Sequence, residues 1–218
     1  MRKIKVNLVN EKRLYLFNME KLKITIPENY KDIKLGQYME FISTDFTTLS
    51  PITKMTRILS ILSDIEEEQI LKLNLPQIQE LIEDLTWLEK QPTPKFKKVI
   101  EIDGVKYGSI PQMNLIKVGE YIDIESYIEN FNGNLHNILA VIYRPIKKYR
   151  SDDDYTIEDY DSTDAQIRAE MFLTKFNTED AIGASLFFYN GVEKYLANLT
   201  GYLEEERRER LREITMMD

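Results

Sequence analysis

A short segment that occurs twice constrains the fold of this chain more than any other feature. Ile33–Phe41 (IKLGQYMEF) recurs as Ile116–Ile124 (IKVGEYIDI), with identical Ile, Lys, Gly and Tyr at matching positions and conservative changes elsewhere. The repetition indicates a degenerate internal duplication. The alternative is a chance likeness between two amphipathic helix starts.

Each copy occupies the same place in a longer order of elements. A strand and an Ile-Pro pair come before it, and a helix with a similar apolar string comes after it, Arg57–Leu62 in one case and Asn137–Ile142 in the other. We therefore predict an α+β, predominantly helical fold. Its two similar halves would each carry a small β-hairpin or strand unit followed by helices.

The best candidate for a boundary between the halves is the segment Pro92–Pro94 (PTP). Closely spaced prolines end helices and mark loops. We predict an N-terminal half at residues 1–91, with strands and then helices, and a C-terminal half at residues 92–218, with a hairpin and then helices.

The clearest local signal is a β-hairpin at residues 98–107. Alternating apolar and polar residues flank Asp103-Gly104, a dipeptide typical of a type I′ turn. Ser50-Pro51 predicts the start of a helix, with Ser50 as the N-cap and Pro51 in the first turn.

Further capping signals and helical spacing predict the remaining elements. Ser63 with Glu66 predicts a capping box, and Asn134 predicts an N-cap. The predicted strands are 4–9, 14–17 and 22–26, and the predicted helices are 35–42, 51–62, 63–71, 76–88, 115–127, 134–142, 165–176, 178–189 and 192–217.

Composition excludes several classes of function. The 218 residues include no cysteine and one histidine (His136), and the net charge of the chain is −8. Disulfides and thiolate chemistry are therefore ruled out, and a generally basic nucleic-acid binder is not expected. No apolar run approaches the roughly 18–20 residues of a membrane span, so we predict no membrane insertion. The 13 tyrosines suit protein interfaces.

The repeated segment has a physical reading of its own. Gly36 and Gly119 stand near the helix starts, where a missing Cβ lets a neighbour approach closely. One interpretation is a packing unit used twice. The other is that the hydroxyls of Tyr38 and Tyr121 face a partner.

An acidic segment, Ser151–Asp164, has no counterpart in the first half. It fails the spacing of an EF-hand, because its sixth and twelfth positions from Asp152 are Ile157 and Thr163. We predict an exposed loop. A weak cation site, a docking patch for a basic partner and pairing with the basic residues just upstream remain open. The candidate partner-binding residues of this segment are Asp152, Asp153, Asp154, Glu158, Asp159 and Asp161.

No pattern of catalytic, cofactor-binding or metal-ligating residues is present. The chain lacks a phosphate-binding loop, a dinucleotide fingerprint, a nucleophile elbow and a zinc-protease helix motif. A lone His136 without a partnered nucleophile is far more often structural than catalytic. We expect no enzymatic activity, no cofactor and no metal. The charged run Leu203–Arg212 predicts an exposed final helix that is also suited to an assembly contact.

Four stretches together carry a family resemblance. They are IPENYKDIKLGQYMEF, SPITKMTRILSIL, FKKVIEIDGVKYGSIPQMNLIKVGEYIDIESYI and NLHNILAVIYRPI. In these stretches the chain resembles proteins encoded among the virion and tail-assembly genes of tailed bacteriophages, particularly crAss-like phages of Bacteroides. The resemblance covers approximately residues 22–203, and its motifs are structural.

The resemblance implies a non-enzymatic structural or assembly protein, present in many copies at the head–tail junction or the tail of a virion. The alternatives are a soluble tail-assembly chaperone that leaves the particle, and a packaged cargo protein ejected with the genome. The implied partners are portal, ring or tail subunits and further copies of the chain, without sequence-specific nucleic-acid binding. The implied location is the virion, with the host cytoplasm during assembly.

Overall fold

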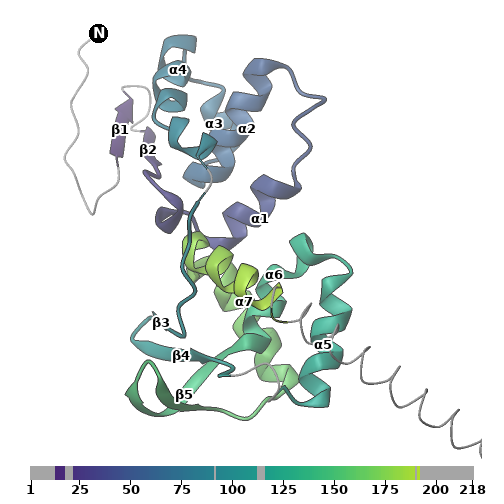
Figure 1. The fold of residues 1–218 in the computed structure, drawn as a ribbon. Helices are drawn as coiled ribbons and strands as arrows, with labels where there is room; N and C mark the ends of the chain where they lie inside the picture. Colours follow the sequence, from purple (N-terminus) through teal and green to yellow (C-terminus); the bar gives the residue numbers. More distant parts are fainter. Residues whose placement is uncertain (1–12, 18–21, 91, 112–115, 190, 192–218) are drawn as a thin grey trace, which may run out of the picture.

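The computed structural model describes residues 13–17, 22–90, 92–111, 116–189 and 191. Figure 1 shows two lobes, an N-terminal lobe drawn at the top and a C-terminal lobe below it, with helix α1 where they meet. Mixed strands and helices with helices in the majority confirm the predicted α+β class.

The N-terminal lobe begins with an antiparallel pair of strands and continues as helices. The predicted strand at residues 4–9 lies outside the described residues, and the strand at residues 13–17 pairs with residues 22–26. The elements are β1 (Arg13–Phe17), β2 (Leu22–Ile26), η1 (Tyr30–Asp32), α1 (Leu35–Ser43), α2 (Pro51–Ser63), α3 (Glu67–Ile70), α4 (Leu75–Glu83) and η2 (Thr86–Glu89).

Helix α2 starts as its sequence predicts and ends differently. The Ser50 side chain accepts a hydrogen bond from the Thr53 amide and Pro51 occupies the first turn, which confirms the predicted cap. The predicted capping box at Ser63 is wrong. Ser63 is the last residue of α2, where its hydroxyl donates to the Leu59 carbonyl, and Glu66 is the N-cap of α3.

The C-terminal lobe is a four-stranded antiparallel sheet with helices packed over it (Figure 1). The strand order is β3-β4-β5-β6, and residues 178–189 form a further helix. The labelled elements are β3 (Val99–Ile102), β4 (Val105–Ser109), α5 (Val118–Ile128), α6 (Phe131–Ile142), β5 (Tyr143–Ser151), β6 (Asp154–Ile157) and α7 (Ser162–Lys175).

The predicted hairpin is the connection between β3 and β4. Asp103 and Gly104 both have positive φ, 51° and 78°, as a type I′ turn requires. The predicted cap at Asn134 is wrong, because α6 begins three residues earlier and Asn130 caps it by accepting from the Gly133 amide.

The acidic segment is exposed, as predicted, but the prediction of a loop is wrong for much of it. Its first half forms the turn of the β5–β6 hairpin and strand β6, and its last residues begin α7. Strand β5 was not predicted, because Arg144-Pro145 is typical of the end of a helix and gives no sign of a strand. The helix does end there, and a strand follows without a connecting loop.

Two clusters of buried side chains form the cores, and α1 contributes to both. Leu35 and Met39 belong to the cluster built on α6, α7 and the sheet. Tyr38 and Phe41 pack against the cluster of the N-terminal lobe. The division at residues 91 and 92 stays a prediction, and α1 is the helix that joins the cores on its two sides.

Backbone hydrogen bonds reinforce this junction. The Leu35 amide donates to the Phe176 carbonyl at 2.8 Å, and the Thr178 amide donates to the Ile33 carbonyl at 2.9 Å. The two segments therefore pair like short antiparallel strands just before α1 and just after α7. Segments more than 140 residues apart in sequence are thus tied together by main-chain bonds.

Candidate interaction site on the repeated helix start

The two copies of the repeated segment begin helices with the same geometry. Lys34 precedes α1 with φ −72° and ψ 151°, and Lys117 precedes α5 with φ −76° and ψ 154°. The side chain three positions later reaches back to the N-cap amide in both copies. Gln37 Oε1 accepts from the Lys34 amide at 3.0 Å, and Glu120 Oε2 accepts from the Lys117 amide at 3.0 Å.

The same position also ties each helix to the end of the next long helix, through different chemistry. Gln37 Nε2 donates to the carbonyls of Ile61 and Leu62 in the last turn of α2, at 3.1 and 3.2 Å. Glu120 Oε1 accepts from Arg144 Nη1 at 2.7 Å, two residues beyond the end of α6. The repeated segment is therefore a clamp between two successive helices in both halves.

The clamp in the C-terminal lobe is a buried ion pair. The Glu120 side chain is 1% exposed and the Arg144 side chain 7% exposed. A second buried cation lies nearby, since the Arg168 guanidinium donates twice to the Ala140 carbonyl, at 3.0 and 2.7 Å. Burial and the charge of Arg144 lower the pKa of Arg168. Sequence reasoning missed both cations, and a signal for Arg144 was its place directly after an apolar run.

The two helices differ most in the exposure of two aligned apolar positions. Leu35 is 0% exposed and Met39 9% exposed, whereas their counterparts on α5, Val118 and Ile122, are 76% and 56% exposed. Large apolar side chains on a helix are normally turned toward a neighbour. Within the described part of the chain, the two positions that are buried on α1 are therefore exposed to solvent on α5.

The two glycines of the repeat follow the same contrast. A Cβ added to Gly36 would lie 2.9 Å from the Leu173 carbonyl oxygen of α7, so this helix contact depends on the missing side chain. A Cβ added to Gly119 would meet no described atom within 4 Å. The prediction of close approach thus describes the first copy only.

The exposed stripe of α5 continues from apolar to acidic residues. Val118, Ile122, Glu125 and Glu129 follow one another at helical spacing, with the last just past the helix, and all four are exposed. We call these four residues the α5 face. It combines an apolar first half with an acidic second half.

The tyrosines predicted as partner contacts lie in two different settings. Tyr38 is half-buried against the N-terminal core, where burial and then the neighbouring Tyr30 raise the pKa of its phenol. This placement suits the packing interpretation for the first copy. Tyr121 is half-buried on α5, so a partner role for its hydroxyl stays a prediction.

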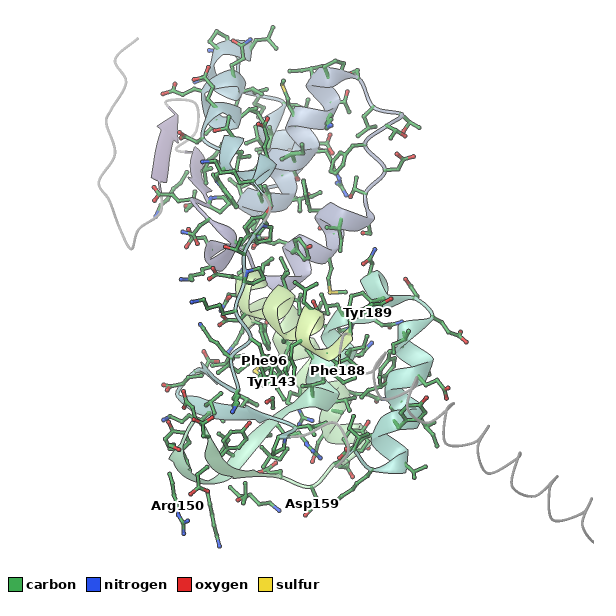
Figure 2. All side chains as sticks on the ribbon, viewed as in Figure 1. Phe96, Tyr143, Arg150, Asp159, Phe188 and Tyr189 are labelled. Atoms are coloured by element: carbon green, nitrogen blue, oxygen red, sulfur yellow. The ribbon has the colours of Figure 1, made fainter. Side chains whose placement is uncertain are left out.

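The acidic residues of the β5–β6 hairpin bind groups of the same chain. Figure 2 shows Arg150 and Asp159 at the outer edge of the sheet. Asp159 lies 3.0 Å from Lys117 Nζ and 3.2 Å from Lys147 Nζ, and hydrogen bonds from these two lysines lower the pKa of its carboxyl. The turn carboxylates pair in the same way, Asp152 with the Tyr149 hydroxyl, Asp153 with Lys98 and Asp154 with Arg150.

The remaining two acidic candidates have structural surroundings. Asp161 is the N-cap of α7 and accepts from the amides of Thr163 and Asp164 at 2.8 and 3.1 Å. Glu158 is exposed, and its backbone amide bonds to the Pro145 carbonyl. Of the interpretations left open for this segment, pairing with the adjacent basic residues agrees with these contacts. Partner binding by its carboxylates stays untested.

The single histidine is built into α6. Burial lowers the pKa of the His136 imidazole, with a smaller opposing effect of Glu170, and no described group bonds to its buried Nδ1 atom. It matches Thr56 of α2 when the two apolar strings are aligned. Thr56 is buried and donates to the Thr53 carbonyl, whereas His136 is half-buried.

Among the described residues, no three or more histidine, cysteine or carboxylate side chains lie close enough together to hold a metal ion. None of the described helices has the length and apolar character needed to span a membrane. No protein-family model, no curated protein and no solved structure matches the chain.

Proposed function

We propose that this chain is a non-enzymatic, multicopy component of a tailed-phage virion, located at the head–tail junction or in the tail, and that it acts through protein–protein contacts. Its partners are portal, ring or tail subunits and further copies of itself. The phage-protein resemblance of residues 22–203 is the reason for naming the virion. The protein is in the host cytoplasm during assembly.

The single observation that carries the contact role is the exposure of Val118 and Ile122. Their counterparts on α1, Leu35 and Met39, are buried against a neighbouring lobe, so this pattern of side chains is made for packing. A subunit that joins others in a ring needs a surface that matches a different surface on its neighbour. The α5 face is the candidate for one such surface.

Mass spectrometry of purified virions tests the assignment. The expected result is this chain in stoichiometric amounts, at several copies per portal assembly. A chain that is found in infected-cell lysate bound to a tail protein, and is absent from particles, would instead be an assembly chaperone. Loss of the chain from particles after genome ejection would identify a cargo protein.

Complementation with variants tests the surface. Ile122→Glu puts a charge on the α5 face and is expected to lower incorporation into particles at least tenfold. Ile167→Glu is the matched control, because Ile167 is also exposed but lies on α7 and is not part of the α5 face. Equal incorporation of both variants would contradict a contact through the α5 face.

A further inference from the structure

The α5 face is complementary to a second exposed surface of the chain. The extended segment before β3 crosses the helix at residues 178–189, and there the Phe96 ring stacks on the Phe187 ring. The ring centroids lie 3.9 Å apart, with an angle of 5° between the planes. Phe187 is 47% exposed and its neighbour Leu186 is 54% exposed. We call Lys95, Phe96, Leu186 and Phe187 the Phe96 patch.

The patch lies on one face of the helix, at the point where the segment crosses it. A Cβ added to Gly183 would lie 2.7 Å from the Lys95 carbonyl oxygen, so the segment rests directly on the helix. Leu186 and Phe187 follow Gly183 by three and four positions, and residues at these spacings are neighbours on a helix surface. The exposed apolar side chains and the backbone of Lys95 are therefore parts of one surface.

The α5 face and the Phe96 patch have charges of opposite sign. Residues 118–129 include four acidic residues and no basic residue, and Glu125 and Glu129 are exposed. Lys95 of the patch is exposed, and residues 181–189 of the helix beneath it include no acidic residue. The two acidic residues near the start of that helix are each paired with a lysine. One surface is thus apolar and acidic, and the other is apolar and basic.

The two surfaces lie on different sides of the C-terminal lobe. Figure 1 shows the segment that leads from the N-terminal lobe into β3 on the left of the molecule, and α5 at the right edge of the lobe. One chain therefore cannot bring its own two surfaces together, whereas two chains can. Contact between unlike surfaces repeats from chain to chain, and it closes a ring when the rotation between neighbours allows.

We propose that the α5 face of one chain packs on the Phe96 patch of a second copy, head to tail. Val118 and Ile122 pack on Leu186 and the aromatic pair, and the two exposed glutamates approach Lys95. The inference rests on the proposed function, because it names the partner of the α5 face. Stable interfaces use about 20–30 residues a side, so this small contact is weak unless a portal or tail subunit holds the copies side by side.

Disulfide trapping between chains tests the contact, because the chain has no native cysteine. Full-length Ile122→Cys protein is mixed at high concentration with full-length Leu186→Cys protein and oxidised. We expect the mixed dimer to form at least fivefold faster than in a mixture with Ile167→Cys protein. Ile167 is the matched control, because it is also an exposed apolar residue on a helix. Non-reducing electrophoresis and mass spectrometry of the linked peptides identify the products.

Equal rates of trapping in the two mixtures would overturn the proposal. Dimers of the Ile122→Cys protein with itself, as the main product, would also overturn it, because they would show that two α5 helices meet. We expect the cysteine variants to keep the fold, since each replaces an exposed side chain, and thermal unfolding of the reduced proteins checks this.

A charge swap tests the ionic part of the contact. Lys95→Glu in the chain with the patch cysteine is expected to slow trapping about two- to fivefold, as an exposed ion pair allows. Glu125→Lys with Glu129→Lys in the other chain is expected to restore the rate. Lys72→Glu, at an exposed lysine of the N-terminal lobe, is the control with the same change of net charge. Equal rates for Lys95→Glu and Lys72→Glu would overturn the proposal.

Incorporation into virions separates this inference from the proposed function. Leu186→Glu is expected to lower incorporation as Ile122→Glu does. A loss for Ile122→Glu alone would overturn the contact between copies and leave the α5 face as a contact with another phage protein. Full incorporation of both variants, together with trapping of the isolated proteins, would support the contact between copies and contradict its role in the virion.

Discussion

Helices α1 and α5 begin with one sequence pattern and one cap geometry, yet they occupy different positions in the molecule. Helix α1 lies between two cores and buries residues on both sides. Helix α5 buries one side, with Glu120 and Ile124 inward, and leaves Val118 and Ile122 outside. The comparison separates the contacts that both copies of the repeated segment make from those that only one copy makes.

The common part is the clamp onto the following helix. A side chain at the third helical position caps its own helix and binds the end of the next, whether by an amide or by a carboxylate. The outward face is the part that differs. The repeated segment therefore has the same internal packing in both places, while its second copy has exposed apolar side chains that a partner could cover.

The largest expected effect concerns the charged version of the clamp. Arg144→Met leaves the Glu120 carboxylate buried without its cation, which should lower the free energy of unfolding by about 3–5 kcal/mol. The double variant with Glu120→Gln, the equivalent of Gln37, should regain most of that loss. Urea unfolding measures both. A single-variant loss below about 1 kcal/mol would show that the pair is not the clamp.

The next effect compares the outward faces. Leu35→Ala should cost about 2–5 kcal/mol, because it leaves a cavity where the lobes meet. Val118→Ala should cost no more than about 1 kcal/mol, because the Val118 side chain is 76% exposed. Denaturant unfolding of the two variants gives the difference. Equal losses would mean that the two faces are equally packed.

The amide version of the clamp should have a smaller effect. Gln37→Ala removes the cap bond and the two bonds to the end of α2, and we expect a loss of about 1–2 kcal/mol. Gln77→Ala is the matched control, because Gln77 makes the same cap bond to Asn74 on α4. A lower melting temperature for Gln37→Ala than for Gln77→Ala is expected. Equal melting temperatures would mean that the bonds from Gln37 to the end of α2 add no stability beyond the cap bond.

The smallest expected effect is a dependence of stability on pH, and it concerns His136, which the repeat aligns with Thr56. Because burial lowers the pKa of His136, the unfolded chain binds its proton more tightly than the folded chain does. Stability should therefore fall as the pH drops below about 6.5. His136→Thr, the residue of the first copy, should reduce that fall. Urea unfolding at pH 7.5 and 5.5 tests it, and an unchanged or larger fall would contradict it.

Local signals in the sequence predicted the local structure well. The Asp103-Gly104 turn and the Ser50-Pro51 helix start depend on backbone preferences of a few residues, and both are found as predicted. The capping box at Ser63 failed because its hydroxyl bonds back to the Leu59 carbonyl inside a helix. A serine hydroxyl can cap the start of a helix or bond back to a carbonyl one turn earlier, and the packed structure decides between the two.

Contacts between distant segments were beyond what the sequence indicates. The Glu120–Arg144 pair joins residues 24 positions apart, and a charged pair in a core has no periodic signature. The acidic segment is exposed, as expected of carboxylates, but its sequence did not indicate which basic groups it pairs with. Its Asp159 is held by Lys117 and Lys147 from two other elements, which only the fold brings together. The repeated segment itself could be seen in the sequence, but which copy would be buried could not.

The most direct test of the central claim, that one repeated unit is packed in α1 and open in α5, is the unfolding free energy of two matched variants. Gly36→Ala forces a Cβ against the Leu173 carbonyl and should lower that free energy by about 1–3 kcal/mol. Gly119→Ala meets open space beside the α5 face and should raise it by about 0.4–1 kcal/mol. Changes of opposite sign are the predicted result. Changes of the same sign and similar size would contradict the account.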